Sequence, residues 1–273
     1  MPETNSRRYR WAEYKTTEFH GLDPNKVIAV LPTAAIEQHG PHLPVGVDTY
    51  LNEGMLETVE ALLPELAPSL DVRILPVQAI GKSNEHLHAA GTLTIPANLA
   101  LRLWTQIGLS VARAGVRKLV IVNSHGGNLD IISILARELR VEARMFAVKY
   151  QWGGLGVPEG LYTPEEMQFG IHGGDVETSM MLHFHPELVD MAKAQNFRST
   201  AQDLSDGKND AVRVPPTGMP AYGWIASDLN SEGTVGDASI ATADKGRMTA
   251  EHYARKFIEL LQGVEATDIS RFD

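Results

Sequence analysis

The alternation of short apolar runs with stretches of helical spacing is the feature of this sequence that most restricts how it folds. The clearest run, residues 118–123, lies between Gly115 and a glycine pair at 126–127, and helical spacing resumes over residues 129–141. Apolar runs at 27–31, 72–76 and 145–150 are also expected strands. Strands that alternate with helices favour a largely parallel sheet with helices on both faces, a three-layer α/β/α sandwich of the α/β class.

The remaining segments predict how the strands are connected. Further helices are expected over residues 11–19, 49–63 (ending at Pro64), 98–114 and 241–262, and one more begins after the glycine pair at 173–174 and stops before Pro186. Residues 151–170 form a segment long enough to suggest a functional lid. Residues 200–232, rich in Asp, Ser, Pro and Gly, are expected to be a loop that supports neighbouring elements or subunits.

Composition limits what the protein binds. The 273 residues, 43% of them hydrophobic, are enough for a sizeable core, and we expect one domain over residues 1–273. A formal net charge of -10 without a Lys/Arg block argues against nucleic acid or an anionic membrane surface and favours a small-molecule substrate. Because there is no cysteine, a metal would take nitrogen and oxygen ligands. The polar residues 1–14 and the lack of an apolar run of ~18 residues make a cytoplasmic enzyme the default expectation.

Ionisable residues gather in the loop that follows the first expected strand. Glu37 and His39 are two positions apart, so an extended backbone directs their side chains to one side and Gln38 to the other. Asp48 follows a Pro/Gly-rich turn, and His125 comes from a second strand end, where open α/β sheets place their ligand chemistry. Each residue alone is consistent with a solvated loop charge or a structural imidazole. Together they favour a metal site, because such groups repel one another when nothing binds them.

A second polar motif surrounds the glycine pair at 173–174. His172 precedes the pair, and Glu177 lies in the first turn of the expected helix, from which it can reach a metal. The alternative is helix capping, since an acidic residue in a first turn is stabilised by roughly 0.3 to 1 kcal/mol through the helix dipole. We accept that alternative for Asp175.

Other polar and aromatic residues are expected on the substrate side. The segment 81–88 contributes Ser83, Glu85 and His86, although a polar surface loop is an equal alternative. Trp152 and Phe169 are expected to wall a pocket. A serine-hydrolase mechanism has weak support, because Ser124 lacks the surroundings of a nucleophile elbow.

Four motifs together resemble the creatininase (creatinine amidohydrolase) superfamily: residues 35–44 with Asp48, residues 123–128, residues 172–179, and residues 233–237 with 241–242. The resemblance implies a three-layer α/β/α fold, a homo-oligomer that is often a hexamer, and amide hydrolysis with two divalent metal ions (Zn, Mn or Fe). It assigns His172 as the catalytic acid/base and Asp48 as the bridging ligand. The implied metal ligands are Glu37, His39, Asp48, His125 and Glu177. His42 is expected to be a support residue instead of a ligand.

Departures from the family pattern bear on the substrate. Creatininase has Tyr and Glu, the latter a metal ligand, where this chain has Gly126 and Gly127, and it has a Trp near the position of Gln168. Creatinine is therefore not expected as the substrate, and Glu177 must replace the missing ligand. We expect a dinuclear metal-dependent amidohydrolase that cleaves a C–N bond in a small polar molecule, such as a cyclic amide or a formamide. The alternatives are a hydrolase that opens a cyclic ketone or lactone, and a metal-binding protein without turnover.

Overall fold

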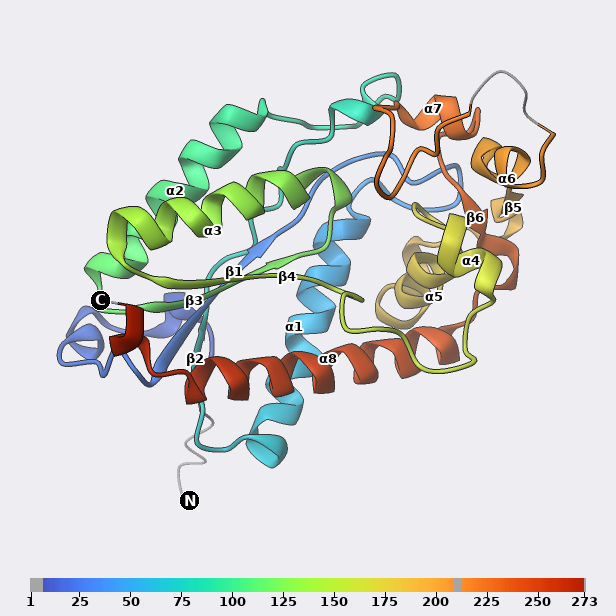
Figure 1. The fold of residues 1–273 in the computed structure, drawn as a ribbon. Helices are drawn as coiled ribbons and strands as arrows, with labels where there is room; N and C mark the ends of the chain where they lie inside the picture. Colours follow the sequence, from blue (N-terminus) through green and yellow to red (C-terminus); the bar gives the residue numbers. More distant parts are fainter. Residues whose placement is uncertain (1–6, 209–212, 273) are drawn as a thin grey trace.

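Four parallel strands form the centre of the molecule in the order β2-β1-β3-β4 (Figure 1). The computed structural model describes residues 7–208 and 213–272. The strands are β1 (Val27–Thr33), β2 (Asp71–Ile74), β3 (Lys118–Asn123) and β4 (Phe146–Gln151). All residues of β1 and β3 are buried, as expected for central strands covered on both faces.

Helices cover both faces of this sheet. Alternate residues of β1 face opposite sides, so Ile28 and Val30 join one hydrophobic cluster while Ala29 and Leu31 join the other. The first cluster includes α1 (Val47–Leu66), α5 (Asp175–Phe184) and α8 (Ala243–Ala266), and the second includes α2 (Ala97–Arg113) and α3 (Leu129–Ala143). The predicted three-layer α/β/α architecture is confirmed.

Several predicted boundaries are wrong in detail. The expected helix over residues 11–19 is two short 3-10 helices, Trp11–Glu13 and Thr16–Phe19. Helix α1 continues past Pro64, because a proline in the last turn removes one backbone hydrogen bond while the buried residues Val59 and Leu63 keep the helix packed. The expected lid contains α4 (Pro164–Phe169), and the expected loop 200–232 contains α6 (Thr200–Ser205) and α7 (Ala226–Leu229). No helix among the described residues has the length and apolar character needed to cross a membrane.

The carboxyl ends of β1 and β3 bring two polar loops together. Thr33 and Asn123 are paired in the sheet register, and the Thr33 hydroxyl donates to Asn123 Oδ1 across 2.9 Å. The loops that follow these strands therefore start side by side. Helices α4 to α7 and the small pair β5 (Asn196–Phe197) and β6 (Gly236–Asp237) gather at one end of the molecule (Figure 1). The metal-type residues predicted from the sequence lie where this end meets the strand ends.

Candidate metal centre

A buried carboxylate, Asp48, lies between two sets of potential metal ligands. Its Oδ1 is 3.6 Å from His39 Nε2, and its Oδ2 is 3.2 Å from His125 Nδ1. Glu37 Oε1 is also 3.2 Å from His125 Nδ1. Asp48 was expected on the loop, but it belongs to the first turn of α1. The helix holds the Asp48 backbone rigidly, so one carboxylate can face both sets.

The segment before α5 and its first turn complete the cluster. Glu177 Oε2 lies 3.8 Å from His39 Nε2 and accepts a hydrogen bond from the Gly173 N–H across 2.6 Å. His172 Nδ1 lies 3.6 Å from Glu37 Oε1. Three overlapping groups have their ligand atoms within 4.8 Å of one another: Glu37 with Asp48 and His125, His39 with His172 and Glu177, and Glu37 with His86 and His172. The structure thus brings together all six residues expected to bind metal or transfer protons.

Backbone carbonyls determine which nitrogen of each histidine faces the cluster. His39 Nδ1 lies 2.9 Å from the Glu37 carbonyl, His125 Nε2 lies 2.9 Å from the Lys82 carbonyl, and His172 Nε2 lies 2.7 Å from the Gln38 carbonyl. A carbonyl oxygen only accepts, so these nitrogens carry the hydrogen. The other nitrogen of each ring is directed at the carboxylates, which is how metal-binding histidines are oriented.

Several buried polar atoms of this cluster have no hydrogen-bond partner among the described residues. They are Glu37 Oε2, His39 Nε2 and Asp48 Oδ2, on side chains that are at most 2% exposed. Buried polar atoms without partners cost free energy, and facing carboxylates repel one another. A divalent cation satisfies such atoms, so the residues present fit a metal site of nitrogen and oxygen ligands.

Proton affinities in the cluster reflect the same excess of negative charge. Burial opposes protonation of His39, but Asp48 and the other carboxylates raise its pKa to about 9. The pKa of His125 is likewise raised well above its usual value, against burial, by Glu37 and Asp48. Burial and the nearby His39 instead lower the pKa of His172 well below its usual range. His172 is therefore the neutral imidazole of the cluster.

A cavity of about 710 Å³ opens onto these residues. Of the residues expected on the substrate side, Glu85 and His86 line it. His86 Nδ1 accepts from the Gln38 side-chain amide across 2.8 Å, which directs its Nε2–H towards Glu37 Oε1, 3.4 Å away. Ser83 does not line the cavity: its hydroxyl lies 3.3 Å from His125 Nε2, on the side of the ring away from Glu37 and Asp48.

The two aromatic residues expected in the pocket lie elsewhere. Trp152 is packed in the core against Phe257, and its indole N–H donates to Asn52 Oδ1 across 3.1 Å. Trp152 directly follows β4. Packing against apolar side chains on this face of the sheet removes more of its ring from water than a place in a polar cavity would. Phe169 lines a neighbouring cavity and not the metal cavity.

The cover of the metal cavity differs from the expected lid at 151–170. Seven residues between 216 and 225 line the cavity, among them Trp224, whose indole N–H donates to the Pro216 carbonyl across 2.9 Å. Within the 151–170 segment Gln151 alone lines the cavity, and the segment packs on α8, where the Tyr162 hydroxyl lies 2.7 Å from that of Thr249. Sequence reasoning missed Trp224 and Lys82 as lining residues. An aromatic residue in a Pro/Gly-rich loop was the available signal for Trp224.

The glycine at position 127 has a local structural reason. A Cβ atom on Gly127 would collide with the Glu85 carboxylate, the Lys82 carbonyl and the His125 ring. Glu85 is held there by an ion pair with Lys82, with 3.0 Å between Oε2 and Nζ. A residue larger than glycine is therefore excluded at position 127. The carboxylate on the His39 side of Asp48 is that of Glu177, in the first turn of α5.

Comparison with known proteins gives consistent family matches. The family model "Creatininase: Creatinine amidohydrolase" matches residues 12–261. A mycofactocin precursor peptide peptidase of Mycobacterium tuberculosis is 33% identical, over 80% of this chain and 78% of that protein. A creatinine amidohydrolase of Pseudomonas putida is 28% identical over 88% and 89%, and a 3-dehydro-scyllo-inosose hydrolase of Thermotoga maritima is 25% identical over 82% and 73%.

Solved structures share the fold. A creatininase described with Mn has a TM-score of 0.72 at 21% identity, covering 96% of this chain and 100% of that one. A variant creatininase of the Zn-Zn type has a TM-score of 0.71 at 21% identity, with the same coverage.

Proposed function

This chain belongs to the creatininase family of hydrolases, and on that basis we propose that it is a dinuclear, divalent-metal-dependent amidohydrolase. Glu37, Asp48 and His125 would hold one ion, and His39, Asp48 and Glu177 the other. Zn and Mn are supported by the names of the structural neighbours, and Fe suits the same donor set.

One observation carries this proposal. The two oxygens of the buried Asp48 face different histidines, and acceptor atoms of Glu37, His39 and Asp48 have no partner among the described residues. A structural ion-pair network would pair these atoms with Lys, Arg or backbone N–H groups. Acceptors that face one another are expected when a pair of cations belongs between them.

The bound ions and the residues around them have different proposed roles in the reaction. Bound divalent ions supply an activated water and polarise a carbonyl. His172 Nε2–H is held by the Gln38 carbonyl, so Nδ1 is the atom that exchanges a proton in the cavity. As a neutral imidazole it can accept a proton from the attacking water and pass it to the leaving nitrogen. Seven residues of loop 216–225 line the cavity, so this loop borders the space that the substrate would occupy.

The bond cleaved is proposed to be a C–N amide bond of a small molecule. Two relatives support this, since one is named a peptidase and another an amidohydrolase. The relative named an inosose hydrolase supports the alternative of opening a cyclic ketone or lactone. Tyr and Glu are absent at positions 126 and 127, so creatinine is not proposed. A homo-oligomer, up to a hexamer, is also proposed, and light scattering of the purified chain tests it.

Metal-dependent turnover is the direct test. The metal-free protein should hydrolyse nothing, and adding back Zn or Mn should restore hydrolysis of amides in a panel that also contains lactones and cyclic ketones. Elemental analysis should give two ions per chain. A protein that binds two ions and hydrolyses no member of the panel would be the non-catalytic alternative.

A further inference from the structure

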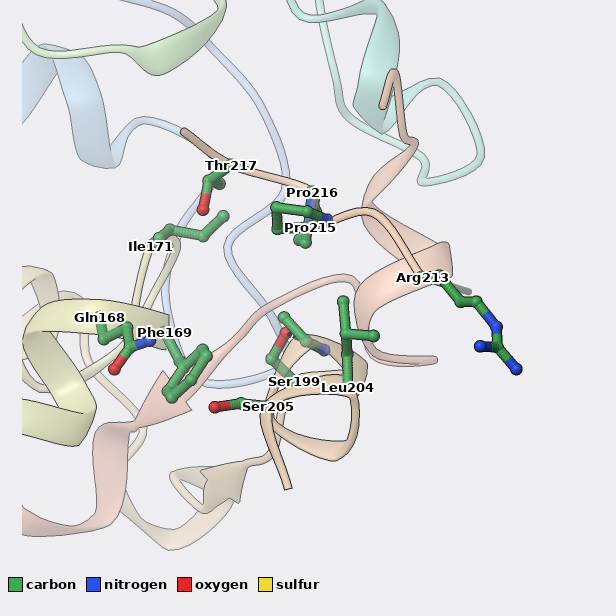
Figure 2. A pocket seen from close by; sticks show the side chains of 11 residues that line it. Gln168, Phe169, Ile171, Ser199, Leu204, Ser205, Arg213, Pro215, Pro216 and Thr217 are labelled. Atoms are coloured by element: carbon green, nitrogen blue, oxygen red, sulfur yellow. Dashed lines mark hydrogen bonds between the residues drawn. The ribbon is translucent and has the colours of Figure 1, made fainter. Parts of the chain in front are cut away.

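A second cavity adjoins the metal cavity. It has a volume of about 380 Å³ and lies between α4, α6 and the loop 213–217 (Figure 2). No residue of the proposed metal cluster lines it, and neither the proposed metal sites nor the proton transfer by His172 uses it. Its lining includes Phe169, Ile171, Leu204, Ser205, Pro215 and Pro216.

No carboxylate or imidazole belongs to the lining of this second cavity, and its polar lining residues Gln168, Ser199, Ser205 and Thr217 are uncharged. Arg213 is the charged lining residue, and Figure 2 shows its guanidinium directed away from the other labelled side chains. The Ser199 hydroxyl already accepts a hydrogen bond from the Ala201 N–H, across 3.2 Å. The metal cavity, in contrast, is lined by carboxylates and imidazoles together with apolar residues such as Trp224 and Ile225. The two spaces therefore suit chemically different parts of a ligand.

Three residues, Ile171, Pro216 and Thr217, line both cavities. Ile171 is directly followed by His172, whose Nδ1 faces Glu37 Oε1. Its side chain is 40% exposed although it is apolar, and it borders both spaces. The second cavity therefore reaches Ile171, the residue that directly precedes the proposed proton-transfer residue His172.

We propose that the second cavity is a subsite for an apolar side chain of the substrate, an uncharged aliphatic or aromatic group attached close to the scissile amide. The inference rests on the proposed amidohydrolase function and specifies its substrate class. A compact cyclic amide or formamide would leave this cavity without an occupant. An apolar group placed there is removed from water against Phe169, Leu204 and Pro215, which favours the extended substrate.

Two model amides that differ only in the apolar group provide the test. N-acetylglycine amide lacks a side chain, and N-acetylleucine amide carries an isobutyl group. With the metal-loaded protein we expect kcat/KM for the leucine amide to exceed that for the glycine amide by about tenfold or more, the size of effect that apolar pockets give. Equal values of kcat/KM for the two amides would overturn the subsite while leaving the amidohydrolase function intact.

A substitution that fills the cavity locates the effect. Ser205 lies at the exposed end of α6, so Ser205→Trp should fold normally and place its ring in the cavity. It should abolish the preference for the leucine amide over the glycine amide. The matched control is Ser110→Trp, at an exposed position of α2 outside both cavities, which should keep the preference. A preference that survives Ser205→Trp refutes the assignment.

Binding separates a failure of the subsite from a failure of the proposed function. If neither amide is hydrolysed, the function fails with these substrates, and calorimetry of the same two compounds with the metal-loaded protein decides the subsite. Binding of the leucine amide about tenfold tighter, lost in Ser205→Trp and kept in Ser110→Trp, supports the subsite. Equal binding of the two compounds refutes it.

Discussion

Glu166 is a buried carboxylate that connects three segments near the metal centre. It is 4% exposed, and it accepts hydrogen bonds from the backbone N–H groups of Asp175 at 2.7 Å and Asp237 at 2.9 Å. A Cβ atom on Gly170 or Gly174 would collide with its carboxyl group. Because Asp175 begins the helix that carries Glu177, Glu166 positions the first turn of α5.

Replacing Glu166 with Ala should destabilise the fold strongly. Hydrogen bonds to a charged acceptor contribute about 1.5–3 kcal/mol each, and the buried Asp175 N–H and the partly buried Asp237 N–H lose their partner. Burial raises the pKa of Glu166, so removing the carboxyl also relieves a desolvation cost that offsets part of the loss. We therefore expect a loss of about 3 kcal/mol, which for a chain of this size lowers Tm by about 6–12 °C. Calorimetry of the metal-free protein measures this change directly.

The neighbouring Glu165 provides a matched control. Its side chain is 66% exposed, lies 3.9 Å from Arg198 Nη1 in a surface ion pair and accepts a hydrogen bond from the Gln202 side-chain amide. Glu165→Ala should therefore change Tm by no more than 1–2 °C, on the order expected of exposed pairs. Glu166→Ala should also weaken metal binding, since α5 is no longer held in place. A Glu166→Ala protein that unfolds within 2 °C of the parent would refute the reasoning.

Four further outcomes are expected. Asp48→Asn should lower the affinity for both metal ions by more than about 100-fold, as measured by metal titration. Loss of a residue that only orients a ligand costs about 10–100-fold, and Asp48 is itself proposed to bind both ions. Retention of both ions would contradict its place between the two sets of ligands. Glu177→Gln should release only the ion on the His39 side, leaving about one ion per chain by elemental analysis. His172→Ala should keep both ions and lower kcat by about 10²–10⁴-fold, and a fully active variant would exclude the acid/base role. Burial lowers the pKa of His42 from 6.5 to about 4, so between these values only the unfolded chain binds the proton. Stability should therefore fall by about 3 kcal/mol as pH drops through that window, and His42→Gln should flatten the dependence of Tm on pH.

The ends of β1 and β3 show what could be predicted from local patterns. Both strands are largely apolar runs, and parallel strands present their carboxyl ends at one edge, so the loops carrying Glu37 and His125 were expected at the same edge. The pairing of β1 with β3 in the structure brings the two loops together. The motif at 172–179 was recognised by its resemblance to a family, and the structure brings His172 and Glu177 to the same cluster. The residues of the cluster were therefore predicted from short segments with a strong residue pattern.

The substrate side was predicted less well, because its contacts join residues distant in the sequence. Trp152 was expected in the pocket, yet its ring packs against Phe257 on α8. The cover of the cavity comes from residues 216–225 instead of 151–170. An aromatic residue in a loop has the same local pattern whether it faces a core or a cavity, so only the packed structure distinguishes the two.

By itself, the sequence determined the order of the four sheet strands and of the long helices that cover them, the nitrogen and oxygen character of the proposed metal donors, and most of the segments that carry them. These follow from hydrophobic periodicity and residue type, which are local properties of the chain. Only the tertiary structure decided which nitrogen of each histidine faces the carboxylates, that Glu166 caps α5, and that a second cavity adjoins the first. Those features depend on contacts such as that of Gln38 with Gly233, 195 positions apart, which no local pattern contains.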